Sequence, residues 1–374
     1  MKILYVTDTF AVWGGMEREL ADKMDILSDQ YNNDVFLLTV NQGVHPLTYD
    51  FHPSVIHIDI GVRMHQQYQY RGLNRLIKRI ELKRMLKCRI KDAIDHFLPD
   101  IIICVKLDFV GVLLDVKGKI PMVVESHTLC KSEFIDGSRC FRRLHVRFWK
   151  QKIRKVNAVV ALTDGDAKEW EKINKNVCVI PNIVHLNNSK TYSTCQERSV
   201  IFVGRFSNQK DIGSLLKIWS YIYKNHPDWK LDIYGAGELK DFYLPSIYEI
   251  KANIHVYEPT AEIMDRYREH SILLLTSLYE PFGLVLPEAM SCGLPVVAFD
   301  CPYGPADIIT DGVDGFLIKN RDIQAFADRV CQLMEDEELR RRMGQNGIVS
   351  SQRYRADVIM PKWINLFEKL LSSQ

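Results

Sequence analysis

Short runs of Val, Ile and Leu alternate with longer amphipathic segments along most of the chain, and this alternation constrains the fold more than any other feature. Strands separated by helices form βαβ units with a mostly parallel sheet. In the first half, helices are predicted near 16–28, 74–97, 139–156 and 164–173. The predicted strands are 3–7, 34–40, 55–60, 101–105, 122–125, 158–162, 200–204, 231–234, 254–256, 272–276, 296–299 and 315–318.

A break in this pattern divides the chain into two predicted domains. A Pro-Asn pair ends an apolar run at 180–182, and a polar stretch follows from 187 to 198. We therefore expect an N-terminal α/β domain over 1–190 and a second over 191–352. An amphipathic helix over 357–371 is expected to cross back to the first domain. With 374 residues, 47% of them apolar, the chain is long enough for two cores.

Bulk composition excludes several classes of protein. Charged residues make up 26% of the chain, and the net charge is only +2, so global disorder is not expected. The nine cysteines show no metal-ligand spacing, which favours a reducing compartment, and Cys104 and Cys178 fit small buried residues. The first residues indicate a strand rather than a signal peptide, and no run of about 18 apolar residues occurs. We expect a cytoplasmic protein.

The most informative motif is the segment 280–288, which reads Glu-Pro-Phe-Gly-Leu-Val-Leu-Pro-Glu. It follows a predicted buried strand and opens a predicted helix, and ligands in parallel α/β sheets bind beyond the carboxyl ends of strands. Free N–H groups at a helix start attract anions, and Gly283 lets the backbone approach a phosphate. If the segment is mostly helical, Glu280 and Glu288 lie about two turns apart on one face.

Five further segments accompany this motif in a fixed order. They are Gly14-Gly15-Met16-Glu17-Arg18, Glu125-Ser126-His127, the segment 203–206 with Lys210-Asp211, the segment 232–238, and the segment 304–309. Together the segments resemble those of the family 4 retaining glycosyltransferases of the GT-B type, most strongly from 200 to about 318. The resemblance implies an α/β fold of two facing Rossmann-like domains, and it implies sugar transfer from a nucleotide-sugar.

The resemblance also implies roles for individual residues. Arg205 and Lys210, with the amides of Gly283, Leu284 and Val285, neutralise the departing diphosphate. Glu288 accepts hydrogen bonds from the ribose, and Glu280 contacts the donor sugar near the reacting carbon. His127 reaches that sugar from the opposite domain. The glycines Gly15 and Gly235 are expected in the loops that bind the donor.

No cofactor is expected, because fixed cations and dipoles suffice to stabilise a departing diphosphate. Asp164-Gly165-Asp166 is the sequence pattern of a metal site in another glycosyltransferase class. Its place at a predicted helix start favours capping by Thr163 or Asp164 instead. UDP is the expected nucleotide, and a glycan or lipid-linked acceptor of cell-envelope polysaccharide synthesis is the expected partner.

Two basic stretches stand out in a nearly neutral chain. Residues 71–91 hold nine Lys and Arg and one acidic residue, Glu81; residues 139–155 hold eight and none. Basic amphipathic helices favour an anionic membrane surface, which predicts peripheral attachment at the inner face of a membrane. The alternative is a solvated face on a helix packed against the sheet. Nucleic acid is not expected, since no nucleic-acid motif accompanies the charge.

Other functions remain open at this point. A nucleotide-sugar epimerase or a glycan phosphorylase can share the two-domain fold, although such phosphorylases are much longer and carry a pyridoxal cofactor on a lysine. A non-catalytic sugar-binding subunit is the third alternative. The presence of Glu280, Glu288, Arg205, Lys210 and His127 together argues against loss of catalysis.

Overall fold

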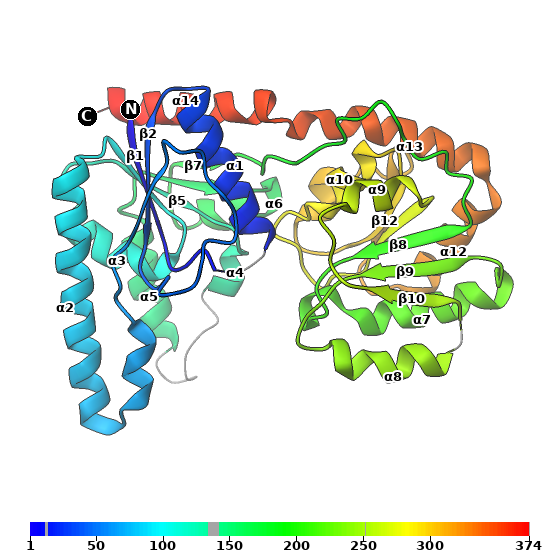
Figure 1. Cartoon of the computed structure of the whole chain (residues 1–374), viewed down its shortest axis with the longest axis horizontal. Helices are drawn as coiled ribbons and strands as arrows, with labels where there is room; N and C mark the ends of the chain where they lie inside the picture. Colours follow the sequence, from blue (N-terminus) through cyan, green and yellow to red (C-terminus); the bar gives the residue numbers. More distant parts are fainter. Residues whose placement is uncertain (12–13, 134–141, 251, 374) are drawn as a thin grey trace. The chain divides into compact units, whose positions relative to one another are not determined.

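A computed structural model describes residues 1–11, 14–133, 142–250 and 252–373 (Figure 1). The chain forms two compact units. The first comprises Met1–Leu162, Asp166–Ile183 and Met360–Gln374, and the second comprises Thr163–Gly165 and Val184–Ile359. The division therefore falls earlier than residue 190, and the second unit runs beyond 352.

The first unit is built on a seven-stranded sheet with the order β3-β2-β1-β4-β5-β6-β7, in which every pair is parallel. The prediction missed β7, whose three residues lie in the apolar run that was interpreted only as the end of the first domain. The strands are β1 Lys2–Thr7, β2 Asp34–Thr39, β3 Ile56–Asp59, β4 Ile101–Cys104, β5 Met122–Glu125, β6 Ala158–Ala161 and β7 Val177–Val179.

Helices cover both faces of this sheet. The helices α2, α3, α5 and α6 pack their apolar side chains on one face, whereas α1 and α14 lie on the other, where Lys23 contacts the rings of Tyr5 and Trp363. The prediction missed α3, in which Phe109, Val110 and Leu113 form a buried face at helical spacing and further apolar residues lie on the other sides. The helices are α1 Gly15–Asp29, η1 Met64–Gln69, α2 Gly72–Phe97, α3 Leu107–Val116, α4 Cys130–Glu133, α5 Arg142–Ile153, α6 Asp164–Glu171 and α14 Ala356–Ser372.

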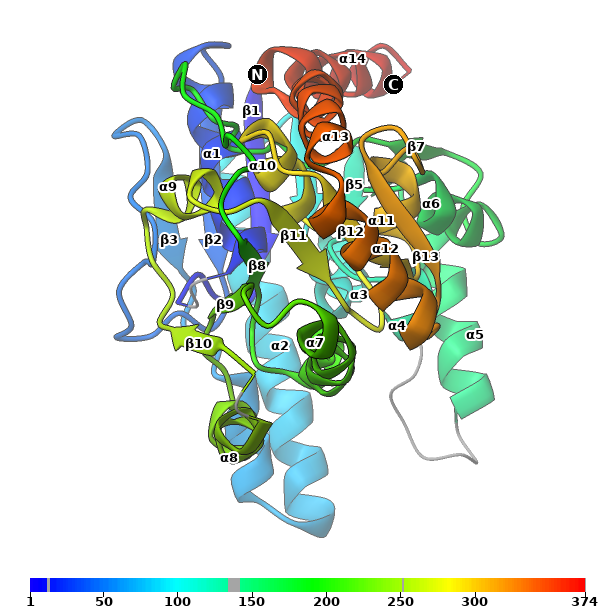
Figure 2. The same ribbon diagram turned by 90° about the vertical axis from the view of Figure 1, so that its right-hand side faces the viewer.

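The second unit is built on a six-stranded parallel sheet with the order β10-β9-β8-β11-β12-β13. Its strands are β8 Ser199–Val203, β9 Lys230–Tyr234, β10 Ile254–Tyr257, β11 Ile272–Leu275, β12 Val296–Asp300 and β13 Gly315–Lys319. Its helices are η2 Asn208–Lys210, α7 Ile212–Asn225, α8 Lys240–Ile250, α9 Ile263–Arg268, α10 Val285–Ser291, α11 Gly304–Ile308, α12 Ile323–Glu335, α13 Glu337–Ser351 and η3 Gln352–Tyr354. Figure 2 shows the same elements from the side.

A buried carboxylate links β9 to the neighbouring strand β10 and to the segment between α9 and β11. Asp232 on β9 accepts hydrogen bonds from His270, at 2.9 Å, and from Lys230, at 2.7 Å, and lies 3.0 Å from the ring nitrogen of His255. Burial raises the pKa of Asp232, but these three partners outweigh it and lower the pKa to about 2. The first residue of the motif 232–238 therefore holds the sheet together.

No helix within the described ranges is both long and apolar enough to cross a membrane. Cys104 is fully buried, as expected, whereas Cys178 is only partly buried, because it lies on the edge strand β7. The first residues of the predicted basic stretch, 139–141, lie outside the described residues.

Candidate active site

The sheet of the second unit reverses its strand order between β8 and β11. In parallel α/β sheets, ligands bind beyond the carboxyl ends of the strands at such a point, because the loops that follow the two strands run in opposite directions. Here the two loops are tied to each other. The Thr276 hydroxyl donates to the Lys210 carbonyl at 3.0 Å, and the Leu278 amide donates to the Gln209 carbonyl at 2.7 Å. The motif residues in the loops that follow β8 and β11 therefore lie close together.

An ion pair lies at this place. The Lys210 ammonium is 2.5 Å from Oε1 of Glu280, and the Ser277 hydroxyl donates to the same oxygen at 2.6 Å. Glu280 is 4% exposed. Its backbone is fixed as well, since its carbonyl accepts from the amides of Tyr303 and Gly304. Both side chains come from predicted site residues, 70 positions apart in sequence.

An arginine that the sequence analysis missed holds this loop pair in place. Arg321, two residues beyond β13, pairs with Asp211 at 2.5 Å and donates to the carbonyls of Thr276 and Ser277 at 2.9 and 2.8 Å. Its guanidinium lies 4.1 Å from the centre of the Phe299 ring. No motif surrounds Arg321, so only its three-dimensional contacts reveal this role.

The expected helical spacing of the two glutamates is wrong. Only Val285–Ser291 is helical, and Gly283 has φ +99°, a backbone conformation that favours glycine. Glu280 lies before this turn, where it bridges to Tyr303, and Glu288 lies in the first turn of α10. Glu288 is 6% exposed and accepts a hydrogen bond from Tyr267 at 3.2 Å. The amides of Leu284 and Val285 precede that of Leu286, which makes the first hydrogen bond of the helix, to the Gly283 carbonyl.

Arg205 lies two residues beyond β8, and it is exposed. Within the part of the chain that the structure describes, no carboxylate forms an ion pair with it. A guanidinium with this freedom can bind phosphate oxygens through two parallel hydrogen bonds. Arg205 and Lys210 therefore place two cations on the loop that follows β8.

The glycines after β9 have a packing role. A Cβ at Gly235 would lie 2.0 Å from the carbonyl oxygen of Gly204, and a Cβ at Gly237 would lie 2.6 Å from that of Phe206. Larger residues would push the β9 loop away from the loop that carries Arg205. This contact explains why glycine occupies position 235, and direct contact between Gly235 and a donor stays a prediction.

In the first unit, Gly15 and His127 follow strands of the sheet. Gly15 is exposed at the start of α1, and Gly14 before it accepts a hydrogen bond from the Tyr49 hydroxyl at 3.2 Å. His127 lies two residues beyond β5, and its side chain is 4% exposed. The buried Nε2 of His127 lies 3.0 Å from Oε1 of Glu125, but the two atoms are not aligned for a hydrogen bond.

Glu125 belongs to a buried charged cluster that comprises Glu19, Lys23, Glu125 and His127. Lys23 is fully buried, lies 3.3 Å from both carboxylate oxygens of Glu19, and donates to Glu125. Burial raises the pKa of Glu125, but Lys23 and His127 outweigh it and lower the pKa to about 2. Burial raises the pKa of Glu19, only partly opposed by Lys23. The two carboxylates share one ammonium, yet the pKa of Glu19 is raised and the pKa of Glu125 is lowered.

The sequence motifs include Glu125 and His127, but they do not predict the buried ion pairs with Lys23. Glu19 and Lys23 are four residues apart on a predicted amphipathic helix, and such a pair is usually a surface ion pair. The structure instead turns both side chains toward the sheet, where Glu125 lies at the end of β5.

Metal binding has two candidate locations among the described residues. Glu19, Glu125 and His127 could offer three ligands within one small space, but the Lys23 ammonium already bonds both carboxylates. A cation there would lie against this ammonium, which disfavours it. In the Asp164-Gly165-Asp166 pattern, the buried Asp166 carboxylate accepts hydrogen bonds from the Cys130 amide and the Trp170 indole, at 2.8 and 2.9 Å. Asp164 is exposed at the start of α6.

Comparison with known proteins identifies the family. Residues 188–349, which include the loops of the second unit, match the family described as "Glycosyl transferases group 1". The amylovoran biosynthesis glycosyltransferase AmsD of Erwinia amylovora is 30% identical over 97% of this chain and 98% of its own length. The chain belongs to the group 1 glycosyltransferases. The expected enzyme class is thereby confirmed at this level.

Two further comparisons place this group 1 glycosyltransferase among its relatives. The poly(ribitol-phosphate) α-N-acetylglucosaminyltransferase of Staphylococcus aureus is 30% identical over 63% of this chain and 48% of its own length. A crystal structure of a point mutant of S. aureus TarM, in complex with Fondaparinux, α-GlcNAc-glycerol and UDP, superimposes with a TM-score of 0.77 at 18% identity. The superposition covers 98% of this chain and 99% of the TarM chain. This similarity confirms the predicted fold of two Rossmann-like domains with parallel sheets.

Proposed function

We propose that this glycosyltransferase moves a hexose from a UDP-sugar to a glycan or lipid-linked acceptor in cell-envelope polysaccharide synthesis. The observation that carries the proposal is the Lys210–Glu280 pair at the strand-order reversal of the second unit, within the residues that match the family. The names of two relatives refer to amylovoran biosynthesis and to poly(ribitol-phosphate), and the S. aureus structure contains UDP.

The chemistry follows from the charges at this place. As the bond between the anomeric carbon and the diphosphate oxygen breaks, its electron pair passes to the diphosphate, and fixed cations stabilise the negative charge. Lys210 has three N–H donors, of which Glu280 takes one, so two remain for phosphate oxygens. Arg205 adds a second cation on the same loop.

The remaining roles stay proposals that rest on the family resemblance. Glu288 accepts the ribose hydroxyls, and Glu280 lies near the reacting carbon. The acceptor hydroxyl attacks from the side of the leaving group and gives its proton to the departing diphosphate oxygen, so the anomeric configuration is retained. His127 contacts the donor sugar through the ring edge away from Glu125, because its Nε2 is buried against that carboxylate.

Release of UDP from a panel of UDP-sugars tests the function, with an acceptor extract present and absent. We expect release from at least one UDP-sugar, and we expect EDTA to leave the rate unchanged because Arg205 and Lys210 supply the positive charge. The sugar must be found either attached to an acceptor or free in solution after hydrolysis. A sugar that is only isomerised and stays bound to UDP would favour an epimerase.

Two results would count against the metal-free mechanism or the proposal itself. Loss of activity in EDTA that is restored by Mg²⁺ or Mn²⁺ would direct attention to Glu19, Glu125 and His127, or to Asp164 and Asp166. No release from any UDP-sugar, by a protein that still binds UDP, would favour a non-catalytic sugar-binding subunit.

A further inference from the structure

The start of α2 projects past the end of the sheet of the first unit. Figure 1 shows η1 lying beside the first turns of α2, with both helices beyond the strands. Residues 71–77 and 79–81 are exposed, so these turns have hardly any protein surface to pack against other than η1. An isolated helix of this length is only marginally stable in water. A binding partner is therefore expected on this helix.

The exposed turns carry large aliphatic side chains. Leu73 is 71% exposed and Ile77 is 56% exposed, with Leu76 and Ile80 near one half. Their spacing of three, four and seven residues places them on one face of the helix. Beside them, Tyr68 and Tyr70 of the η1 segment are exposed as well, and Arg75 lies 4.6 Å from the centre of the Tyr68 ring. A contiguous exposed apolar surface of this kind indicates an interaction site.

Two turns further along α2, the same face of the helix carries basic side chains. Leu76, Ile77 and Ile80 are each followed seven residues later by an exposed basic side chain. These are Lys83, Arg84 and Lys87, of which Lys87 also pairs with the exposed Asp115 at 3.4 Å. Seven residues are two helical turns, or about 10 Å. The face therefore has an aliphatic tip followed by a band of positive charge.

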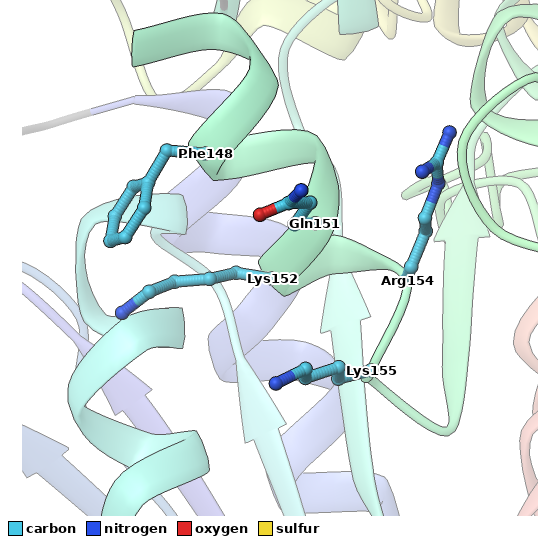
Figure 3. Close-up of a pocket in the computed structure, with 5 residues that line it drawn as sticks. All are labelled: Phe148, Gln151, Lys152, Arg154 and Lys155. Carbon is cyan, nitrogen blue, oxygen red and sulfur yellow. The ribbon is translucent and has the colours of Figure 1, made fainter. Parts of the chain in front are cut away.

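A second group of basic residues lies beside this band. Burial and the neighbouring cations Arg79 and Lys152 lower the pKa of Lys83, which places Lys152 of α5 close to α2. Lys152 lines an open cavity of about 380 Å³ together with Phe148, Gln151, Arg154 and Lys155. Figure 3 shows Phe148 and Lys152 extending from α5 toward the same side. None of the five residues is acidic, so the cavity extends the positive surface.

We propose that the aliphatic tip of α2 inserts into a lipid bilayer with anionic headgroups, and that Lys83, Arg84, Lys87 and the α5 cavity contact the headgroup phosphates. A second copy of this chain is a poorer partner, since nine basic residues over 71–91 would face nine others. A soluble polyanion fits the charge but gives no reason for four exposed aliphatic side chains. The inference concerns binding alone and stands without the proposed transfer reaction.

Sedimentation of the full chain with lipid vesicles tests the inference. We expect binding to phosphatidylcholine vesicles that contain phosphatidylglycerol, weaker binding at high salt, and little binding to phosphatidylcholine alone. The variant L76S/I77S should bind the anionic vesicles about tenfold more weakly, because two aliphatic side chains no longer enter the bilayer. The variant K83E/R84E should lose at least as much. The control V313S/V349S changes two exposed valines of the second unit and should bind like the wild type.

Three results would overturn the inference. The first is a wild-type protein that ignores anionic vesicles at low salt. The second is L76S/I77S binding equal to that of the wild type, which together with loss in K83E/R84E would indicate a surface that binds polyanions only. The third is self-association of the wild type without lipid, lost in L76S/I77S and measured by sedimentation velocity, which would assign the tip to a second copy.

Discussion

Replacing Glu280 by glutamine is expected to lower turnover at least about a hundredfold while UDP affinity changes by less than about threefold. The substitution keeps the shape of the side chain and leaves an oxygen for the Ser277 hydroxyl. It removes the negative charge that lies 2.5 Å from the Lys210 ammonium and, in the proposed mechanism, near the reacting carbon. Initial rates of UDP release at saturating donor measure turnover, and calorimetry measures UDP affinity.

The matched control is Glu258→Gln. Glu258 also pairs with a lysine of the second unit, Lys240, but its side chain is 75% exposed and it belongs to none of the family segments. The Glu258→Gln protein should release UDP at the same rate as the wild type. Normal turnover in the Glu280→Gln protein would remove Glu280 from the reaction and leave it only a structural partner of Lys210.

Replacing Lys23 by methionine is expected to destabilise the first unit by about 3–5 kcal/mol. Lys23 is fully buried and is shared by two buried carboxylates, so its removal leaves Glu19 and Glu125 without their cation. Urea unfolding followed by tryptophan fluorescence measures the loss, because the Lys23 ammonium lies 4.5 Å from the centre of the Trp363 ring.

The effect of Lys23→Met should depend on pH in a defined direction. The pKa of Glu125 is lowered from 4.5 to about 2 in the folded protein, so the stability that its ionised form contributes is present above pH 4.5 and is lost as the pH falls toward 2. The difference in free energy of unfolding between the wild type and the variant should therefore be largest near neutral pH. It should become smaller as the pH falls from 4.5 to 2. The control is Lys91→Met, in an exposed pair with Asp95, which should cost less than about 1 kcal/mol. A loss in Lys23→Met no larger than in this control would mean that the cluster is not a stabilising ion network.

Much of the fold could be predicted because buried parallel strands appear as short apolar runs. The twelve predicted strands correspond to strands of the two sheets, and β7 was missed because its apolar run was interpreted only as the end of the first domain. The helix α3 was missed because apolar residues outside its buried face, such as Leu107 and Leu114, obscure the helical spacing of Phe109, Val110 and Leu113. Local pattern thus fails for a short run beside a predicted domain boundary and for a helix with apolar residues on several sides.

The candidate site was predictable only in part. The sequence motifs name Lys210 and Glu280, but only the strand-order reversal shows why residues 70 positions apart meet. The two-turn spacing of Glu280 and Glu288 failed because the turn at Gly283, with φ +99°, comes before the helix. Arg321, Glu19 and Lys23 carry no motif, and their importance arises from burial and partners that are distant in sequence.

Calorimetric titration of the full chain with UDP is the most direct test of the central claim, that the β8 loop of the second unit binds the donor diphosphate. The assignment predicts that the wild type binds UDP and that Lys210→Ala binds it about ten- to a hundredfold more weakly, as loss of a charged hydrogen bond of about 1.5–3 kcal/mol requires. The control Lys240→Ala, which removes a lysine paired with the exposed Glu258, should bind like the wild type. Equal UDP affinity in the wild type and Lys210→Ala, or no UDP binding by the wild type, would contradict the claim.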